Sequence, residues 1–329
     1  MPLTGDSMKI GFPLKLIVFT FIFFNKIGGV CLAAPLIISN FDYDLRPIEH
    51  VFNSAPKRVL TTNGSSTELL LRLGLEDHII GTAFLDNPVS PDLQTAYERL
   101  PVISSRYPTK EKVLSLEPDF IYGWNTAFAP QALGGVSYWN KLGIKTFIAR
   151  NSLLNPKTIE HFYHDILELG RIFQVEDRAE SIVAQTKREL AQIAEDTKDI
   201  PVRPQIMLGR PSQHGAFLAW GVDSLAGNMV ELAGGEIVFP RNGQYSLESI
   251  LGADPEVIIL VYMLQDAESL EDQVRTLTEH PVLRKVTAVK NGRIYGLPFA
   301  EAYCSEARIV AGVKRLAHYF HPDKFHAPD

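Results

Sequence analysis

Cysteine is almost missing from this sequence, which has two cysteines in 329 residues. Cys31 lies in an N-terminal segment that we expect to be removed, and Cys304 lies near the end of the chain. The mature protein would then hold one thiol and no disulfide, so its stability must come from a packed core. A chain of this length is long enough to form two domains with such cores.

The sequence also lacks a basic stripe and the short motifs of the common enzyme classes. Its formal net charge is -6, which argues against a nucleic-acid-binding protein. It contains no G-x-S-x-G, P-loop, G-x-G-x-x-G or H-E-x-x-H motif. We therefore expect no nucleic-acid partner, no enzyme activity, no catalytic residue and no cofactor. An exported enzyme stays a rival class, because a catalytic constellation can be built from distant residues.

A bare metal site is not indicated either. His161, His164 and Asp165 lie close together on a predicted helix and form a candidate cluster. Histidines on a helix surface are more often solvated, and a metal ion requires three or four converging ligands. The sequence therefore predicts no metal site.

The first 34 residues form a distinct segment. Lys9 and Lys15 precede an apolar run of nine residues, 16–24, and the segment ends in the small residues Ala33 and Ala34. This order is typical of a secretory signal peptide. The apolar run is too short to span a bilayer comfortably, which takes about 20 residues. We expect a signal peptide over residues 1–34, with an uncleaved anchor as the alternative.

Two details of this segment stay open. Translation can begin at Met1 or at Met8, and MKIGFPLK is the more typical opening of a signal peptide. Cys31 is a candidate for a lipid anchor, but Val30 is a poor match to the small residue expected before a lipidated cysteine. We expect export without an anchor, and treat lipid anchoring as the alternative.

Short apolar strands alternate with helices from Arg58 onward. A helix is expected after NGSS, where Ser65 and Glu68 fit a capping box and Gly74 fits a helix end. Residues 35–57 have mixed polarity and predict an irregular lead-in. Strands that alternate with helices and short loops favour a parallel α/β sheet. The predicted strands of this part are 58–62, 77–84, 101–105, 119–124 and 144–150.

A long helix divides the alternating pattern into two parts. Ala179, Ile182, Val183, Leu190 and Ile193 fall on one face of residues 177–197, at helical spacing. Strands and helices then resume, from QIMLGR at 205–210 to RIYGLP at 293–298. We predict an α/β fold of two lobes, each with a central and mostly parallel sheet, joined by one long α-helix. The expected boundaries are 35–176 for the first lobe, 177–200 for the linker helix and 201–329 for the second lobe.

One phrase occurs twice, 137 residues apart. EKVLSLEPDFIYGW begins at Glu111 and ESILGADPEVIILV begins at Glu248. Both have Glu first, Leu three residues later, Pro at plus seven and Ile at plus ten. Each copy predicts a short helix, a turn at Pro and a buried strand, in the same place within each lobe. We interpret the match as a structural repeat.

The loops that follow the predicted strands are rich in aromatic side chains, with a few polar and cationic ones. In open α/β sheets, ligands bind beyond the carboxyl ends of the strands. Such a set suits a large, partly flat and partly anionic ligand held between two walls. The predicted ligand-binding residues are Asn63, Phe84, Arg106, Tyr107 and Trp124 in the first lobe, and Arg210, His214, Trp220, Tyr245 and Tyr262 in the second.

These segments together resemble the periplasmic substrate-binding proteins of ABC importers, in the class with a single helical linker. That class includes binders of ferric siderophores, vitamin B12 and haem. The resemblance covers about residues 55–320. It is carried by PKRVLTTNGSSTELLLRLGLEDHIIGTA, EKVLSLEPDFIYGW, RAESIVAQTKREL, LAGGEIVF and SLESILGADPEVIIL.

The resemblance implies a periplasmic receptor that binds a small-molecule metal chelate and delivers it to the permease of an ABC importer. We expect a monomer and a ligand of the iron(III)-siderophore type. Vitamin B12 or another corrinoid, haem, and an oxyanion or other metal chelate stay open as ligands. A scaffold that kept the fold without transport is a further alternative.

The resemblance also implies roles for single residues. In this family each lobe presents a glutamate that docks onto arginines of the permease, and the matching positions are Glu111 and Glu248. Trp124 matches a tryptophan of the vitamin B12-binding member, but the loop of Arg106 and Tyr107 lacks a second such tryptophan. In siderophore binders, arginines often neutralise the ligand. Arg106 and Arg210 are the candidates here, and Arg308 is either a third or a brace for the last helix.

Overall fold

The computed structural model describes residues 34–212, 216–263, 266, 268–304 and 308–326. The predicted signal peptide, Cys31 and His214 lie outside the described residues. A compact unit of the chain begins at Pro35. Within the described part, every helix is too short or too polar to cross a membrane.

The residues after the predicted signal form an antiparallel hairpin, so the prediction of an irregular lead-in was wrong. Strand β1, Leu36–Phe41, pairs with β2, Pro47–Phe52. Two of the buried positions of this hairpin are polar, Asn40 and His50. They hide the alternation of apolar and polar residues by which a half-buried strand is normally detected. The amide of Asn40 bonds the backbone of Ile148 at both its ends, at 2.9 and 3.2 Å.

The first lobe contains a five-stranded parallel sheet, as the sequence predicts, and its strands lie in the order β5-β4-β3-β6-β7. Its strands are β3 Val59–Thr61, β4 Ile79–Ala83, β5 Val102–Ser104, β6 Phe120–Gly123 and β7 Lys145–Ile148. Its α-helices are α1 Gly64–Arg72, α2 Gln94–Tyr97, α3 Lys110–Ser115, α4 Val136–Lys141 and α5 Ile159–Phe173. A 3-10 turn at Glu76–His78 lies between α1 and β4, and others follow β4, β6 and β7 at Pro91–Leu93, Asn125–Phe128 and Arg150–Ser152.

Helix α1 begins differently from the prediction. Asn63 is its N-cap residue, and the expected capping box of Ser65 and Glu68 is absent among the described contacts. The Glu68 carboxylate instead accepts a hydrogen bond from the backbone N–H of Ser90, at 3.0 Å. Glu68 is buried and faces other elements, so it cannot turn back to the start of its own helix. The helix end at Gly74 is confirmed, with a left-handed φ of 69°.

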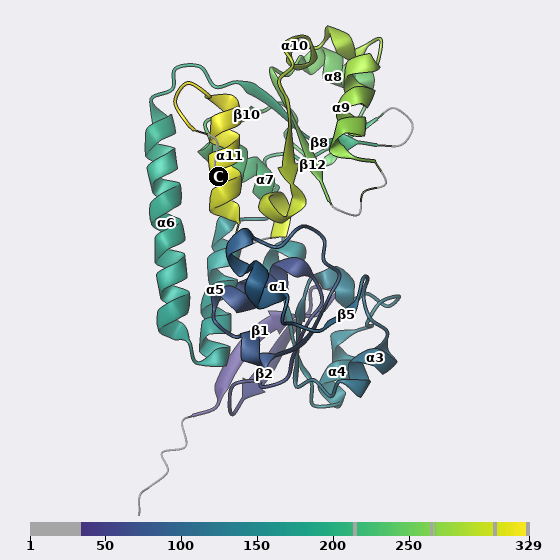
Figure 1. Cartoon of the computed structure of the whole chain (residues 1–329), viewed down its shortest axis with the longest axis vertical. Coiled ribbons are helices and arrows are strands. Elements are labelled where there is room, and N and C mark those ends of the chain that lie inside the picture. Colours follow the sequence, from purple (N-terminus) through teal and green to yellow (C-terminus); the bar gives the residue numbers. More distant parts are fainter. Residues whose placement is uncertain (1–33, 213–215, 264–265, 267, 305–307, 327–329) are drawn as a thin grey trace, which may run out of the picture. The chain divides into compact units, whose positions relative to one another are not determined.

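The predicted long helix is confirmed as α6, Glu176–Lys198 (Figure 1). It packs against α5, and the two helices are separated by a short turn at Gln174. Ala179, Val183, Leu190 and Ile193 are buried on one face, as their spacing predicts.

The second lobe contains a mixed sheet in the order β11-β9-β8-β12-β13, with β10 also paired to β8. The pairs of β8 with β10, β8 with β12 and β12 with β13 are parallel, whereas β9 and β11 run antiparallel. Its strands are β8 Gln205–Pro211, β9 Phe217–Ala219, β10 Glu236–Ile237, β11 Gly243–Tyr245, β12 Val257–Tyr262 and β13 Ile294–Pro298. Its helices are α7 Leu225–Leu232, α8 Leu247–Ala253, α9 Leu270–Glu279, α10 Thr287–Lys290 and α11 Ile309–Phe320, with a 3-10 turn at Leu283–Lys285 and a π-turn at Ala300–Cys304.

The repeated phrase adopts the same local structure in both lobes. Positions 109–125 and 246–262, seventeen residues each, agree at every position in whether the residue is buried, half-buried or exposed. The side chains of Thr109 and Ser246 cap α3 and α8 by accepting hydrogen bonds from backbone N–H groups, at 3.3 and 3.2 Å. Each copy then has a left-handed residue, Glu117 or Asp254, directly before its proline. The prediction of a structural repeat is confirmed.

Candidate ligand pocket and docking helices

Four aromatic rings form a row that starts in the first lobe and ends in the second. The ring centroids of Tyr107 and Phe84 are 5.1 Å apart, and those of Phe84 and Trp124 are 6.2 Å apart. Trp124 then meets Phe299 edge to face, at 5.7 Å. Three of these residues were predicted from the sequence, and Phe299, which directly follows β13, was missed. The structure therefore brings the predicted first-lobe aromatics together.

The side chain of Asn63 holds the indole ring of Trp124 in place. Asn63 is 0 % exposed. With its amide oriented to satisfy both ends, its oxygen accepts a hydrogen bond from the indole N–H of Trp124 at 3.0 Å and from Ser66 N at 3.2 Å. Trp124 itself is only 7 % exposed. Asn63 is thus buried beside the aromatic row, and it contributes to the site by fixing the Trp124 indole.

A cavity of about 550 Å³ opens beside this row, in the first lobe. Phe84, Arg106 and Tyr107 line it, as predicted for ligand-binding residues, together with Lys110 and Gln131, which the sequence did not suggest. The Arg106 guanidinium lies over the Phe84 ring, 5.9 Å from its centroid. The Tyr107 hydroxyl is 2.7 Å from that of Thr126, which orients the phenol ring. The wall combines aromatic faces with two cationic side chains.

Arg210 and Tyr245 lie apart from this row. Arg210 forms an ion pair with Asp266, at 3.4 Å, and both line a separate cavity of about 410 Å³. The Tyr245 ring stacks on Phe239 with centroids 3.9 Å apart, and its hydroxyl donates to the Arg241 carbonyl at 2.9 Å. Each of these two residues thus has a polar partner outside the aromatic row.

Trp220 and Tyr262, the remaining predicted residues of the second lobe that the structure describes, are half-buried. Trp220 packs against the main hydrophobic core, and its backbone N–H donates to the Leu208 carbonyl. Tyr262 ends β12, and burial raises the pKa of its phenol, with the nearby Glu301 acting in the same direction. Packing against the core therefore fixes the positions of Trp220 and Tyr262 at least as much as a role in ligand binding would.

Arg308 acts as a brace. Its guanidinium donates to both carboxylate oxygens of Glu68, at 2.8 Å from Nε, and also to the Pro88 carbonyl. Both side chains of the ion pair are largely buried. The structure thus shows Arg308 as a brace to the first lobe, which differs from the predicted brace for the last helix.

The two glutamates expected to dock with a permease occupy matching positions. Glu111 lies in the first turn of α3 and Glu248 in the first turn of α8, and both are exposed. Hydrogen bonds from their own backbone N–H groups lower the pKa of both carboxyls, helped by the hydroxyls of Thr109 and Ser246. Both side chains are therefore ionised at neutral pH and face solvent.

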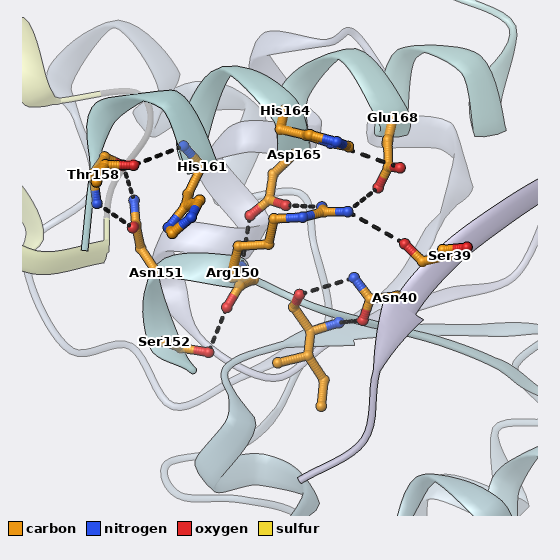
Figure 2. Close-up of polar contacts among 12 residues, drawn as sticks. Ser39, Asn40, Arg150, Asn151, Ser152, Thr158, His161, His164, Asp165 and Glu168 are labelled. Atoms are coloured by element: carbon orange, nitrogen blue, oxygen red, sulfur yellow. Dashed lines mark hydrogen bonds and ion pairs between the residues drawn. The ribbon is translucent and has the colours of Figure 1, made fainter. Parts of the chain in front are cut away.

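Within the cluster of His161, His164 and Asp165, Asp165 pairs with Arg150 and His164 lies 3.6 Å from Glu168, in an ion-pair network (Figure 2). Asp165 is buried and pairs with Arg150, which also donates to Glu168 at 2.7 Å and to the Ser39 carbonyl. Burial acts to lower the pKa of Arg150, but Asp165 and Glu168 outweigh it and raise the value. Among the described residues, no group of three or more metal-ligating side chains is present.

A larger cavity, of about 1140 Å³, lies along α6 and α11. It is lined by aliphatic residues such as Ile182 and Val310 and by charged side chains. Lys314 and Glu189 both line it and form an ion pair with each other, at 2.6 Å. None of the described residues predicted to bind ligand lines this cavity, so we place the candidate site at the first-lobe pocket.

Comparisons with known proteins agree with this architecture. The sequence model of the periplasmic binding protein family matches residues 59–301. Because that match covers most of the chain, the protein belongs to this family. The resemblance to substrate-binding proteins of ABC importers, of the siderophore, vitamin B12 and haem class, is thereby confirmed.

Two curated relatives show the range of this class. A vitamin B12-binding protein of Photorhabdus laumondii is 23% identical over 266 residues, which cover 78% of this chain and 85% of the relative. A petrobactin-binding protein of Bacillus subtilis is 23% identical over 259 residues, which cover 76% and 77%.

Solved structures show the same fold. A periplasmic binding protein from Veillonella parvula has a TM-score of 0.79 and 27% identity, and the match covers 88% of this chain and 98% of that one. A protein of an ABC-type Fe3+-hydroxamate transport system from Saccharomonospora viridis has a TM-score of 0.71 and 20% identity, with 87% and 99% covered.

Proposed function

We propose that this protein is an exported receptor that binds an anionic metal chelate of the iron(III)-siderophore type and delivers it to the permease of an ABC importer. It would act in the periplasm, as a monomer and without catalysis. The observation that carries the ligand class is the first-lobe pocket, in which the Arg106 guanidinium lies over Phe84 and Lys110 lines the same wall.

The chemistry of this wall supports an anionic ligand with flat faces. Arg106 and Lys110 supply two cations, and Glu111 lines the cavity with a single opposing carboxylate. Aromatic faces give large contact areas, and a cation over a ring fixes the position of both groups. A cavity of about 550 Å³ also lies within the usual range for small-molecule sites. A catecholate chelate offers such faces and such charge.

A corrinoid is the second candidate, because a curated relative binds vitamin B12 and Trp124 lies in the aromatic row. One observation counts against it. Trp124 is only 7 % exposed and meets Phe84 and Phe299 edge to face, so little of its surface is open to a ligand. A corrin ring would need Phe299 to move away before it could stack there.

Delivery would use the glutamates of the two repeated helices. Glu111 and Glu248 are exposed and ionised, and each projects from the first turn of a capped helix. A carboxylate pairs with an arginine through directional, charge-assisted hydrogen bonds. One such group in each lobe gives the permease two points of attachment.

A fluorescence titration tests the ligand. The mature protein is titrated with ferric catecholate, ferric hydroxamate, haem, cyanocobalamin and molybdate, with corrections for inner-filter absorption. We expect saturable quenching by one ferric chelate, weakened about tenfold or more in Arg106→Ala, because a charge-assisted contact is worth about 1.5–3 kcal/mol. The exposed Arg46→Ala serves as the control. Saturable quenching by haem or cobalamin alone would reject the iron chelate.

An uptake assay tests delivery. The Glu111→Ala/Glu248→Ala protein should bind the ligand at least as tightly as the wild type, because Glu111 opposes an anionic ligand in the pocket, and should lose transport in the source organism. Glu180→Ala, which removes an exposed glutamate of α6, is the matched control. Normal uptake by a stably expressed double variant would reject the docking role.

A further inference from the structure

Leu114 and Leu251 are exposed at matching positions of the two repeated helices. Each leucine is 38 % exposed. A single exposed leucine is ordinary on a protein surface and has no meaning alone. Here the same exposure occurs twice, in two segments that are 137 residues apart and share one local structure.

The repeat allows surface requirements to be separated from folding requirements. Six exposed positions are common to α3 and α8 with their flanks, and only two of these hold the same residue in both copies. Those two are the glutamate of the first turn and the leucine three residues later. Thr109 and Ser246 are caps, and Glu117 and Asp254 form the left-handed turn, so these exposed residues serve the fold.

The glutamate and the leucine lie on one face of each helix. Residues three apart are neighbours on a helix surface. Glu111 therefore lies beside Leu114, and Glu248 beside Leu251. By contrast, the exposed residue that directly follows the glutamate is Lys112 in one copy and Ser249 in the other. The shared surface is a carboxylate next to an apolar side chain, which we call the Glu–Leu pair.

From this we infer that Leu114 and Leu251 are apolar docking contacts for the importer's permease, acting with Glu111 and Glu248. The inference rests on the proposed delivery function. Because the two Glu–Leu pairs are alike, the partner must offer two like surfaces, each with a cation beside an apolar depression. Two like permease subunits meet that requirement. Burial of each leucine would also exclude water from the ion pair next to it and so strengthen it.

The test measures binding to membranes rather than ligand transport. Labelled mature protein is added to right-side-out membrane vesicles from the source organism, and unlabelled wild-type protein is the competitor. Leu114→Ala/Leu251→Ala should weaken saturable binding about tenfold or more, as for loss of apolar contacts at an interface centre. Alanine keeps helix propensity, and thermal unfolding of the variant checks its fold.

Matched leucines provide the control. Leu142 and Leu167 are exposed by 51 % and 36 % in other helical regions, and Leu142→Ala/Leu167→Ala should bind like the wild type. If the glutamate double variant loses binding while the Leu114/Leu251 variant does not, the leucine contacts are rejected and docking stands. If neither variant loses binding, or the wild type does not bind saturably, docking through these helices is rejected as well.

Discussion

The carboxylate of Glu68 and the guanidinium of Arg308 form a two-point ion pair, although 240 residues separate them in the chain. The pair joins α1 of the first lobe to the residue before α11 of the second lobe. Glu68 also accepts from Ser90 N, and Arg308 donates to the Pro88 carbonyl. The ends of the pair are therefore held by backbone groups as well as by each other.

Loss of one partner from this pair should destabilise the protein strongly. Glu68→Ala leaves the buried Arg308 guanidinium without its carboxylate, and we expect a loss of about 3–5 kcal/mol in the free energy of unfolding. Urea denaturation measures it. Glu68→Met/Arg308→Met removes both charges and should cost much less than the single change. A single variant within about 1 kcal/mol of the wild type would contradict the assignment of this pair as a brace.

A second prediction concerns Arg150, whose guanidinium serves both Asp165 and Glu168 in Figure 2. Arg150→Met leaves two buried carboxylates without a cation, so we expect a loss of about 3–5 kcal/mol. Arg46→Met is the comparison, because the Arg46 side chain is 74% exposed and pairs with Asp44 at the surface. Its loss should change stability by less than about 1 kcal/mol. Equal effects of the two changes would show that burial of the network does not matter.

The titration of the Asp86 carboxyl should be visible in the pH dependence of the free energy of unfolding. Asp86 is only 1 % exposed, and this burial raises the pKa of its carboxyl from 3.8 to about 6. Between these two values the folded protein binds a proton more readily than the unfolded chain, so stability falls as the pH rises from about 4 to 6. The difference of about two pKa units corresponds to roughly 3 kcal/mol at most.

Asp86→Asn isolates this contribution. The amide oxygen can still accept from Gly64 N, which Asp86 Oδ1 does at 3.2 Å, but the side chain no longer titrates. Unfolding free energies at pH 4, 5, 6 and 7 should therefore decline more steeply for the wild type than for the variant. Parallel profiles would show that Asp86 does not titrate in this window.

Two lysines flank Glu111 and allow the ligand pocket to be separated from the docking helix. Lys110 lines the 550 Å³ cavity, whereas Lys112 lies outside its lining and is exposed. Lys110→Met should weaken binding of the ferric chelate about tenfold, because it removes one charge-assisted contact. Lys112→Met changes the net charge equally and should leave ligand affinity within about twofold, as expected for a screened surface charge. Equal losses would mean that only long-range charge matters.

Most of the fold could be predicted from the sequence because its elements follow simple periodicity. The parallel strands of the first lobe are short apolar runs between turn signals, and α6 has a clear apolar face. The hairpin of β1 and β2 could not be recognised in this way, since Asn40 and His50 occupy inward positions. Strands β9 and β11 are three residues each, too short to show alternation.

Capping illustrates how one motif can mislead and inform. Ser65 and Glu68 have the spacing of a capping box, but Glu68 is drawn to Arg308, a contact that no local pattern reveals. Ser269 and Asp272 do form a capping box, at the start of α9, a helix that was not predicted from the sequence. The S-x-x-D spacing there was available as a signal.

The candidate site was predictable only in part. The strand-end rule found Phe84, Tyr107 and Trp124, which the structure brings together. The same rule could have found Phe299, which directly follows β13. Lys110 could not be found, because its place in the pocket depends on how α3 packs against the loops beside it. Arg210 followed the rule but pairs with Asp266 elsewhere.

The repeated segment gives the chain two equivalent copies of one local structure, so each copy can serve as a control for the other. A substitution at any of the positions 109–125 has a counterpart in 246–262 with the same degree of burial. An effect that appears in both copies reflects the common architecture of capped helix, turn and strand. An effect that appears in only one copy reflects what that lobe does alone. Paired mutagenesis of the two segments can thus distinguish architecture from recognition inside a single chain.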